Sequence, residues 1–155
     1  MKTKYIFGIF AIFFSVWVSA QEINWFTLEQ AEKEQKKSPE KPLFIDFYTD
    51  WCGWCKKMDA STFKDVEVAQ YINDNYIPVK FDAESKEEVS FKGKTYKNVK
   101  IPNSRKGVHS FAYFTLRGRL SYPAYAILNN DGKLTGLLLG YMDKSTLLSG
   151  LKGEE

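Results

Sequence analysis

Two cysteines, Cys52 and Cys55, are the residues of this sequence best suited to carry chemistry. They are the two cysteines of a 155-residue chain, and two residues separate them within the stretch DFYTDWCGWCKKMD (46–59). A pair at this spacing can form a redox centre, half of a metal site, a haem attachment point or a structural disulfide. The neighbouring residues favour one of these four interpretations.

Three of the interpretations fit the sequence poorly. A structural zinc site needs four Cys or His ligands, and the single histidine, His109, lies beside aromatic residues in a predicted helix, which is typical of a core or helix-surface histidine. A haem attachment motif requires histidine after the second cysteine, where this chain has Lys56. A disulfide across two residues closes too short a loop to stabilise the fold much. We therefore expect no metal and no bound cofactor.

The redox interpretation gains support from the elements on either side of the pair. The segment PLFIDFYT (42–49) predicts a buried strand, and a helix is predicted from Cys52 to about Thr62. Cys52 then lies at a helix N-terminus, where free N–H groups and the helix dipole favour a thiolate. Cys55 lies one turn later and is expected to point inward. This asymmetry suits thiol–disulfide exchange, in which one sulfur attacks and the other resolves the mixed disulfide.

The rest of the chain predicts an α/β order around this strand and helix. Thr27 and Gln30 have the spacing of a capping box within INWFTLEQAEKEQKK, which predicts a first helix over 23–37. The later elements are expected, in chain order, to be a helix capped by Asp65, a buried strand at 76–83, a helix over 108–120, a hairpin over 122–141 that turns at Asp131 and Gly132, and a last helix capped by Asp143.

Residues 83–107 interrupt this order. They are polar, with acids up to Glu88 and only basic charges after it. This composition predicts a long loop or small hairpin inserted into the domain. Two interpretations are open: a solvated surface insertion, or a segment that docks a partner or covers the active site.

The first twenty residues predict a cleaved secretory signal peptide. Basic MKTK precedes an apolar run, and small residues at the cleavage positions end at Ala20. The run is shorter than the roughly 20 residues of a spanning helix, so cleavage is preferred over a membrane anchor. We expect 21–155 to form one domain in the periplasm or outside the cell. Losing Lys2 and Lys4 lowers the formal charge from +3 to +1, which gives no electrostatic reason to expect nucleic acid or membrane binding.

The stretch PLFIDFYTDWCGWCK resembles the active-site segment of thioredoxin-fold proteins, in which a strand ending DFWA precedes WCGPCK. The resemblance extends over nearly all of 25–151 except the insertion. It is similar in particular to the exported bacterial thioredoxin-like group and to the electron-relay domains of periplasmic transmembrane reductases. It implies an α/β thioredoxin fold: a central mixed β-sheet flanked by helices, with the 83–107 insertion before the helix that leads to a cis-proline.

The resemblance also implies roles for single residues. Asp46 falls on the family's buried acid, which assists proton transfer at the resolving cysteine, and Lys80 falls on the lysine that pairs with it. Asp46 could instead be a solvated or capped acid, but its flanking residues Ile45 and Phe47 indicate burial. Pro123 falls on the cis-proline that faces the disulfide and docks substrate backbone, although a proline there could simply start an edge strand.

The resemblance implies that the residues around a Cys52–Cys55 disulfide bind substrate: Trp51, Gly53, Trp54, Tyr122 and Pro123. Two of them depart from the family pattern. Trp54 replaces the usual proline between the cysteines, which leaves the reduction potential open. Tyr122 replaces a small or β-branched residue before the cis-proline, which leaves the substrate preference open.

The sequence therefore predicts an exported thiol–disulfide oxidoreductase that reduces or isomerises disulfides of protein substrates. No cofactor is implied, but turnover requires an electron donor, for which a membrane-bound reductase is expected. Two alternatives stay open: a disulfide oxidase, and a partner-binding module on a thioredoxin scaffold in which the CxxC pair is incidental.

Overall fold

The computed structural model of the protein describes residues 21–102 and 106–153. The predicted signal peptide, residues 1–20, lies outside these ranges. The described residues contain a four-stranded mixed sheet in the order β2-β1-β7-β8, with β1 parallel to β2 and antiparallel to β7. The strands of this sheet are β1 (Leu43–Tyr48), β2 (Ile77–Asp82), β7 (Ala124–Leu128) and β8 (Leu134–Leu139). The predicted mixed α/β architecture is thus confirmed.

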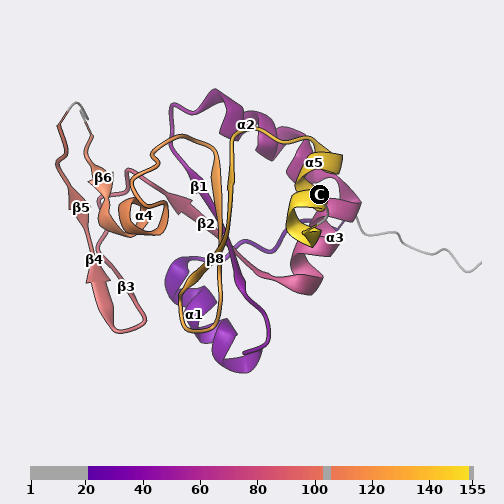
Figure 1. Ribbon diagram of the computed structural model, residues 1–155, viewed down its shortest axis with the longest axis horizontal. Helices are drawn as coiled ribbons and strands as arrows, with labels where there is room; N and C mark the ends of the chain where they lie inside the picture. The colour runs from indigo at the N-terminus through magenta and orange to yellow at the C-terminus, as the bar shows by residue number, and fades with distance from the viewer. Residues whose placement is uncertain (1–20, 103–105, 154–155) are drawn as a thin grey trace, which may run out of the picture.

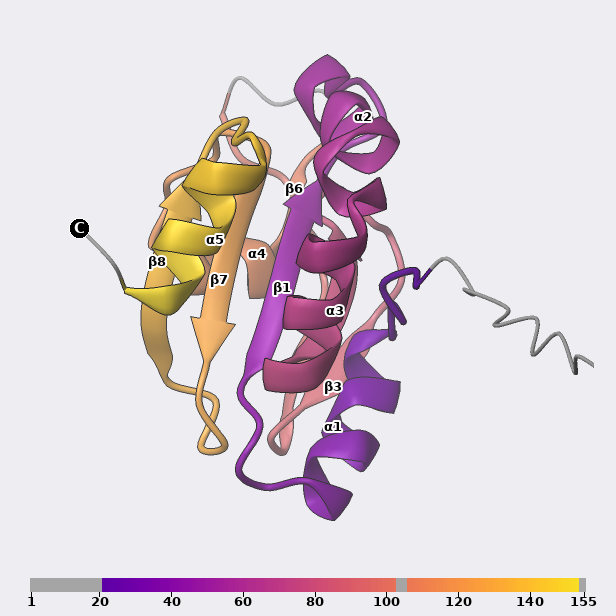
Figure 2. The ribbon, with the colours of Figure 1, turned by 90° about the vertical axis from the view of Figure 1, so that its right-hand side faces the viewer.

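Helices cover both faces of the sheet (Figures 1 and 2). The helical elements are α1 (Leu28–Lys37), α2 (Gly53–Ala60), the 3₁₀ turn η1 (Thr62–Lys64), α3 (Val66–Asn75), α4 (Ser110–Thr115) and α5 (Lys144–Lys152). Buried side chains of α1 and α4 form one core cluster against the sheet. Those of α2, α3 and α5 form the second cluster on the opposite face, where Figure 2 shows α3 and α5 in front of β1 and β7.

Alternation along the strands decides which residues reach each face, because successive side chains of a strand point to opposite sides. In β1, Ile45 and Phe47 join the cluster of α1 and α4, whereas Phe44 joins the cluster of α2, α3 and α5. Asp46 has the same parity as Phe44. It therefore points to the face covered by α2, the helix that begins at the cysteine pair.

The predicted helix caps are present. Thr27 and Gln30 form a reciprocal capping box, and Asp65 and Asp143 accept backbone N–H bonds at the starts of α3 and α5. The prediction that the first helix spans 23–37 is wrong at its start, because α1 begins only after its cap, at Leu28. The chain before the cap is not helical: Phe26 pairs with β2, donating its N–H to Pro78 O and accepting from Lys80 N–H.

The prediction of a helix over 108–120 is wrong at both ends. Val108 and His109 form the short strand β6, and α4 stops at Thr115. The chain then adopts left-handed backbone at Arg117 and Gly118, which a helix cannot continue through.

The segment 83–107 contains a β-hairpin and one strand of a second ladder. Its strands are β3 (Val89–Phe91), β4 (Lys94–Tyr96) and β5 (Asn98–Val99), and β5 pairs with β6 (Val108–His109). Phe91 is buried within the cluster of α1 and α4, and Tyr96 packs against that cluster. Part of this segment therefore contributes to the core, and Figure 1 shows it beside α4 at the edge of the fold.

None of the helices in the described ranges has the length and hydropathy needed to cross a membrane.

Candidate active site

The cysteine pair stands at the start of α2. Cys52 is the N-cap residue of this helix, and its Sγ accepts a hydrogen bond of 3.0 Å from the Cys55 N–H. The two cysteines form a disulfide with Cα atoms 5.3 Å apart, and each residue is only 4% exposed. The positive end of the helix therefore points at the Cys52 sulfur, where it stabilises a thiolate once the bond is reduced.

A buried carboxyl lies on the sheet face beneath α2. Asp46 is 2% exposed, and Lys80 is its neighbour across the parallel β1–β2 pair, with Nζ 3.6 Å from Asp46 Oδ2. The Lys80 ammonium also forms an ion pair with Asp59 of α2. On the other side, Tyr125 is the partner of Asp46 in the antiparallel β1–β7 pair, and its buried hydroxyl makes no hydrogen bond to the described residues. The predicted pairing of Asp46 with Lys80 is present.

Burial raises the pKa of Asp46 to about 7. The Lys80 ammonium opposes this rise, while the nearby Asp59 carboxylate adds to it. Asp46 Oδ1 is buried without a hydrogen-bond partner among the described residues, so little stabilises the charged form beyond Lys80. A carboxyl with this pKa can both accept and donate a proton near neutral pH, which is the property that general acid–base catalysis requires.

We predict that Lys80 and Asp59 control the pKa of Asp46 in opposite directions. Lys80→Met removes the cation that favours the carboxylate and should raise the pKa above that of the wild type. Asp59→Asn removes a repelling charge and leaves the Lys80 ammonium to Asp46 alone, so this variant should lower the pKa of Asp46. Carboxyl ¹³C NMR titration of Asp46 measures both shifts, with Asp131→Asn, a change at an exposed turn residue, as the control that leaves the curve unmoved. Shifts of the same sign in both variants would contradict this assignment.

Trp51 and Tyr122 lie together on the surface beside the disulfide. Trp51 is 63% exposed and donates its Nε1–H to Glu84 Oε2 at 3.1 Å. Its ring meets the ring of Tyr122 edge-on at 6.2 Å. The Tyr122–Pro123 peptide bond is cis, as predicted. The loop before β7 therefore lies next to the loop that carries the cysteine pair.

Gly53 and Trp54 lie between the two cysteines. Gly53 is exposed, and nothing lies within 4 Å of the position that a Cβ would occupy. Trp54 is 56% exposed, with its ring 5.3 Å from that of Tyr141. The Lys57 ammonium lies over both rings, at 5.0 Å and 4.6 Å from their centroids. The disulfide is thus bordered by exposed aromatic surface on two sides.

Three charged residues near the site were not predicted from the sequence: Asp59, Glu84 and Lys57. The position of Asp59 offered a signal, because it follows Cys55 by four residues and so shares its face of α2. Glu84 offered none, since its contact with Trp51 joins residues 33 positions apart.

His109 is a core residue, which is one of the two placements that its aromatic neighbours predicted. It is fully buried, its Nδ1 accepts a hydrogen bond from the Phe111 N–H at 3.2 Å, and its Nε2 lies 3.0 Å from Glu87 O. Burial lowers its pKa. Within residues 21–102 and 106–153, no group of three or more His, Cys, Asp or Glu side chains is placed to hold a metal ion.

Comparison with known proteins places this site in a family. The family model Thioredox_DsbH, with the description "Protein of unknown function, DUF255", matches residues 14–126, which is most of the chain and includes the cysteine pair, Asp46, Lys80 and Pro123. The chain belongs to the Thioredox_DsbH family.

Two solved structures show the fold of this Thioredox_DsbH chain. The oxidised C-terminal domain of DsbD from Neisseria meningitidis has a TM-score of 0.54 and 22% identity, covering 82% of this chain and 91% of that domain. A thioredoxin from Thermus thermophilus has a TM-score of 0.57 and 13% identity, covering 85% of this chain and 86% of its own. At these identities the likeness concerns the fold alone, and it confirms the predicted thioredoxin fold.

Curated relatives match this Thioredox_DsbH chain over short segments. The thiol:disulfide interchange protein DsbD of Neisseria meningitidis is 47% identical over 38 residues, which are 24% of this chain and 6% of that protein. The first curated relatives are matched over 67 residues and only 8–9% of their own length. The chain therefore corresponds to a small part of these larger proteins.

Proposed function

We propose that this protein is an exported thiol–disulfide oxidoreductase that reduces or isomerises disulfides of protein substrates. The observation that carries the proposal is the Cys52–Cys55 disulfide at the N-terminus of α2, the helix that packs over the buried Asp46. This arrangement combines a stabilised thiolate with a group that exchanges protons near neutral pH. A structural disulfide across two residues needs neither a stabilised thiolate nor a nearby group that exchanges protons.

The first step of the reaction uses Cys52. In the reduced protein the Cys52 thiolate attacks one sulfur of a substrate disulfide. The substrate S–S bond breaks, a mixed disulfide forms, and one substrate thiolate leaves and takes up a proton. The exposed aromatic rings of Trp51 and Trp54 offer apolar contacts to the substrate, and we assign Pro123 to dock the substrate backbone.

The second step uses Cys55. The Cys55 thiol gives its proton to the Asp46 carboxylate, and the resulting thiolate attacks Cys52 Sγ. The mixed disulfide breaks and the second substrate thiolate leaves. Two electrons have then passed from the protein to the substrate, and Cys52 and Cys55 are joined as they are in the present structure.

Further turnover requires a dithiol that reduces this disulfide again. In an oxidising compartment we assign that role to a membrane-bound reductase, and we place the protein in the periplasm. The similarity to DsbD, a thiol:disulfide interchange protein, supports both assignments.

Reduction of insulin by dithiothreitol tests the activity. The protein comprising residues 21–155 should accelerate insulin precipitation, and Cys52→Ser should return the rate to the uncatalysed level, because the variant lacks the attacking sulfur. Equal rates for the two proteins would refute the oxidoreductase. A Cys52–Cys55 pair that does not equilibrate with glutathione buffers would instead favour a binding module.

The same glutathione titration tests the direction of electron flow. A reduction potential of about −180 mV or lower supports net reduction or isomerisation, and a value of about −120 mV would indicate an oxidase.

A further inference from the structure

A second concave site lies at the opposite end of the sheet from the cysteine pair. Leu128, which lines it, ends β7 and pairs with Leu43 at the start of β1, whereas β1 leads at its other end to the cysteines. A six-residue strand is about 20 Å long, so the two sites are well separated. The cavity also lies on the α1 and α4 side, and Asp46 points to the other side. A ligand here would not contact the redox centre.

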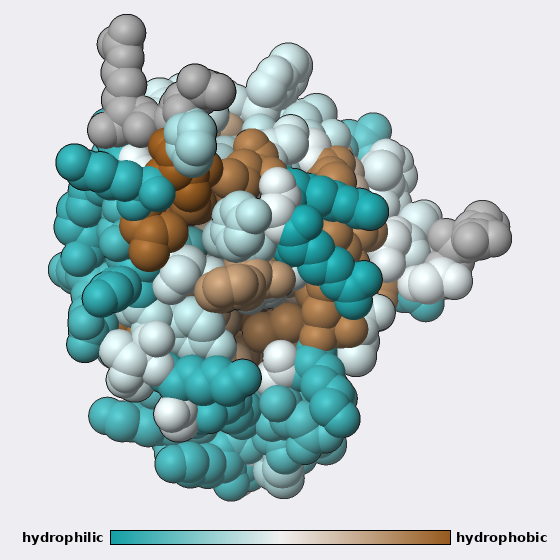
Figure 3. Space-filling model, turned by 60° about the vertical axis from the view of Figure 1, so that its left-hand side comes forward, coloured by the Kyte–Doolittle hydropathy of each residue, from teal (hydrophilic) through white to brown (hydrophobic). Residues whose placement is uncertain are grey.

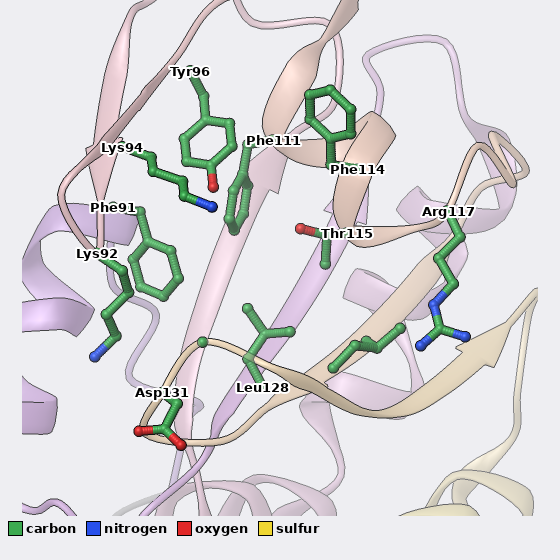
Figure 4. A pocket seen from close by; sticks show the side chains of 12 residues that line it. Phe91, Lys92, Lys94, Tyr96, Phe111, Phe114, Thr115, Arg117, Leu128 and Asp131 are labelled. Atoms are coloured by element: carbon green, nitrogen blue, oxygen red, sulfur yellow. The ribbon is translucent and has the colours of Figure 1, made fainter.

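The cavity has a volume of about 320 Å³, which is at the lower end of the range for small-molecule sites. Three parts of the chain enclose it: the β3–β4 hairpin, α4 with the turn after it, and the β7–β8 turn (Figure 4). Part of its wall is apolar, with Phe91, Phe111 and Leu128 buried and Phe114 68% exposed at its edge, and the rest is polar. Figure 3 shows this side of the molecule, where apolar side chains lie between hydrophilic ones that border them.

The charged residues that line this cavity are three cations and one acid. Lys92, Lys94 and Arg117 are the cations, and Asp131 is the acid, whose carboxylate points away from the aromatic rings in Figure 4. Within the described ranges, neither the Lys94 ammonium nor the Arg117 guanidinium forms an ion pair or hydrogen bond. Figure 4 shows these two side chains on opposite sides of the cavity. The site therefore carries uncompensated positive charge beside an apolar wall.

Two of these cations occupy turn positions. Among the described residues, Lys92 (φ 49°) and Arg117 (φ 53°) are the two non-glycine residues with a positive φ. Lys92 and Gly93 form the two-residue turn of the β3–β4 hairpin, in which both residues need a positive φ, and Arg117 follows the end of α4. Each of the two turns thus places a cation at the cavity.

The hairpin wall is held in place without a ligand. The Lys92 N–H donates to Glu32 Oε1 at 3.1 Å, and its Nζ donates to Gln35 Oε1 at 2.9 Å, which ties the hairpin to α1. Phe91 is anchored in the core behind it. The cavity is thus a preformed feature of the fold, and the segment 83–107 supplies one of its walls.

We propose that this cavity binds a small organic anion with an aromatic or branched apolar body. The apolar part of the wall accepts the body, and the positive charges of Lys94 and Arg117 on either side of the cavity attract the anionic group. The volume between these three short elements suits a molecule of up to three rings.

The test uses 1-anilinonaphthalene-8-sulfonate as the probe and its neutral counterpart N-phenyl-1-naphthylamine, which has the same rings without the sulfonate. Amide NMR shifts in the oxidised protein locate each probe and give its affinity. We expect the sulfonate to shift residues of β3, β4 and α4, and to bind about tenfold or more tightly than the neutral amine.

Two variants separate binding from folding. Arg117→Gly removes a cation and supplies the residue that a positive φ favours, so it should fold at least as well as the wild type while losing roughly tenfold in sulfonate affinity. Lys94→Gln should lose a similar factor, and neither change should alter binding of the neutral amine. Arg119→Gln, a nearby cation outside the cavity, is the matched control and should bind like the wild type.

Three results would overturn the proposal. One is equal affinity for the two probes, and another is unchanged sulfonate binding in both cavity variants. The third is a set of shifts confined to residues around Cys52 and Cys55. Insulin reduction by the same variants should stay at the wild-type rate, so this proposal and the redox activity fail independently.

Discussion

Asp46→Asn is expected to raise the free energy of unfolding of the oxidised protein at pH 8 by about 2 to 4 kcal/mol. Most substitutions of buried residues have the opposite sign. The gain arises because the native state holds an ionised carboxyl on Asp46, a residue that is only 2% exposed. Its Oδ2 has one ion-pair partner at 3.6 Å, and its Oδ1 has no hydrogen-bond partner among the described residues. Asparagine has nearly the same shape and carries no charge.

The size and pH range follow from the pKa of Asp46. Burial raises this pKa from 3.8 to about 7, so the folded state binds a proton more tightly than the unfolded chain between these two values. The stability of the wild type should therefore fall as the pH rises from about 4 to about 7, and stay lower above that. A shift of roughly three pKa units corresponds to about 4 kcal/mol. The new amide N–H lacks a partner, which reduces the gain by about 1–2 kcal/mol.

Urea denaturation of the oxidised protein at a series of pH values measures this effect. The free energy of unfolding of Asp46→Asn should lie slightly below that of the wild type at pH 4, where the unpartnered amide is the main difference, and should exceed it by the full amount at pH 8. Asp131→Asn, at an exposed turn, should stay within about 0.5 kcal/mol of the wild type throughout. If Asp46→Asn is less stable than the wild type at pH 8, then Asp46 stabilises the fold through its contacts, and burial of its charge does not dominate.

In the insulin assay Asp46→Asn should be slower than the wild type by a factor on the order of 10², since Cys55 loses its proposed proton acceptor.

Cys55→Ser is expected to reduce turnover to background and to trap a covalent adduct on Cys52. Cys52 keeps its place at the N-terminus of α2 and can still attack a substrate disulfide. Without the second sulfur, no intramolecular step displaces the substrate, so the mixed disulfide persists. Mass spectrometry of a mixture with insulin or another disulfide substrate, quenched with acid, should show one substrate molecule joined to each protein molecule.

Cys52→Ser is the matched control for this trapping experiment, because it keeps one cysteine of the pair and lacks the proposed nucleophile. It should form little adduct under the same conditions. An equal yield of adduct on Cys55 would contradict the assignment of roles. The experiment distinguishes the two sulfurs, which burial alone does not, because both cysteines are only 4% exposed in the oxidised protein.

On the proposed function, stability and catalysis compete at Asp46. A charge-free residue would make a more stable protein, while the carboxyl provides a group that titrates near neutral pH on the sheet face covered by α2. Lys80 and Asp59 set the balance between the two, since one ammonium is shared by two carboxylates. Retaining such a costly group is typical of a catalytic site.

The sequence by itself determined the features that depend on local patterns. These features depend on residues only a few positions apart. They are the capping box of Thr27 and Gln30, the caps at Asp65 and Asp143, and the buried strand β1. The placement of Cys52 at a helix start follows from the same kind of pattern, because the strand ends and the helix begins within five residues. Family resemblance added the cis bond at Pro123, which no local pattern specifies.

Only the tertiary structure decided which distant groups meet. The sharing of Lys80 between Asp46 and Asp59, the bond from Trp51 to Glu84 and the burial of Phe91 under α4 all join residues far apart in the chain. So does the cavity of Lys94 and Arg117, whose walls come from three separate parts of the sequence. Backbone hydrogen bonding and side-chain alternation act over a few residues and leave a readable pattern. Contacts between elements depend on how the helices and hairpin pack on the sheet, and a single sequence does not record that packing.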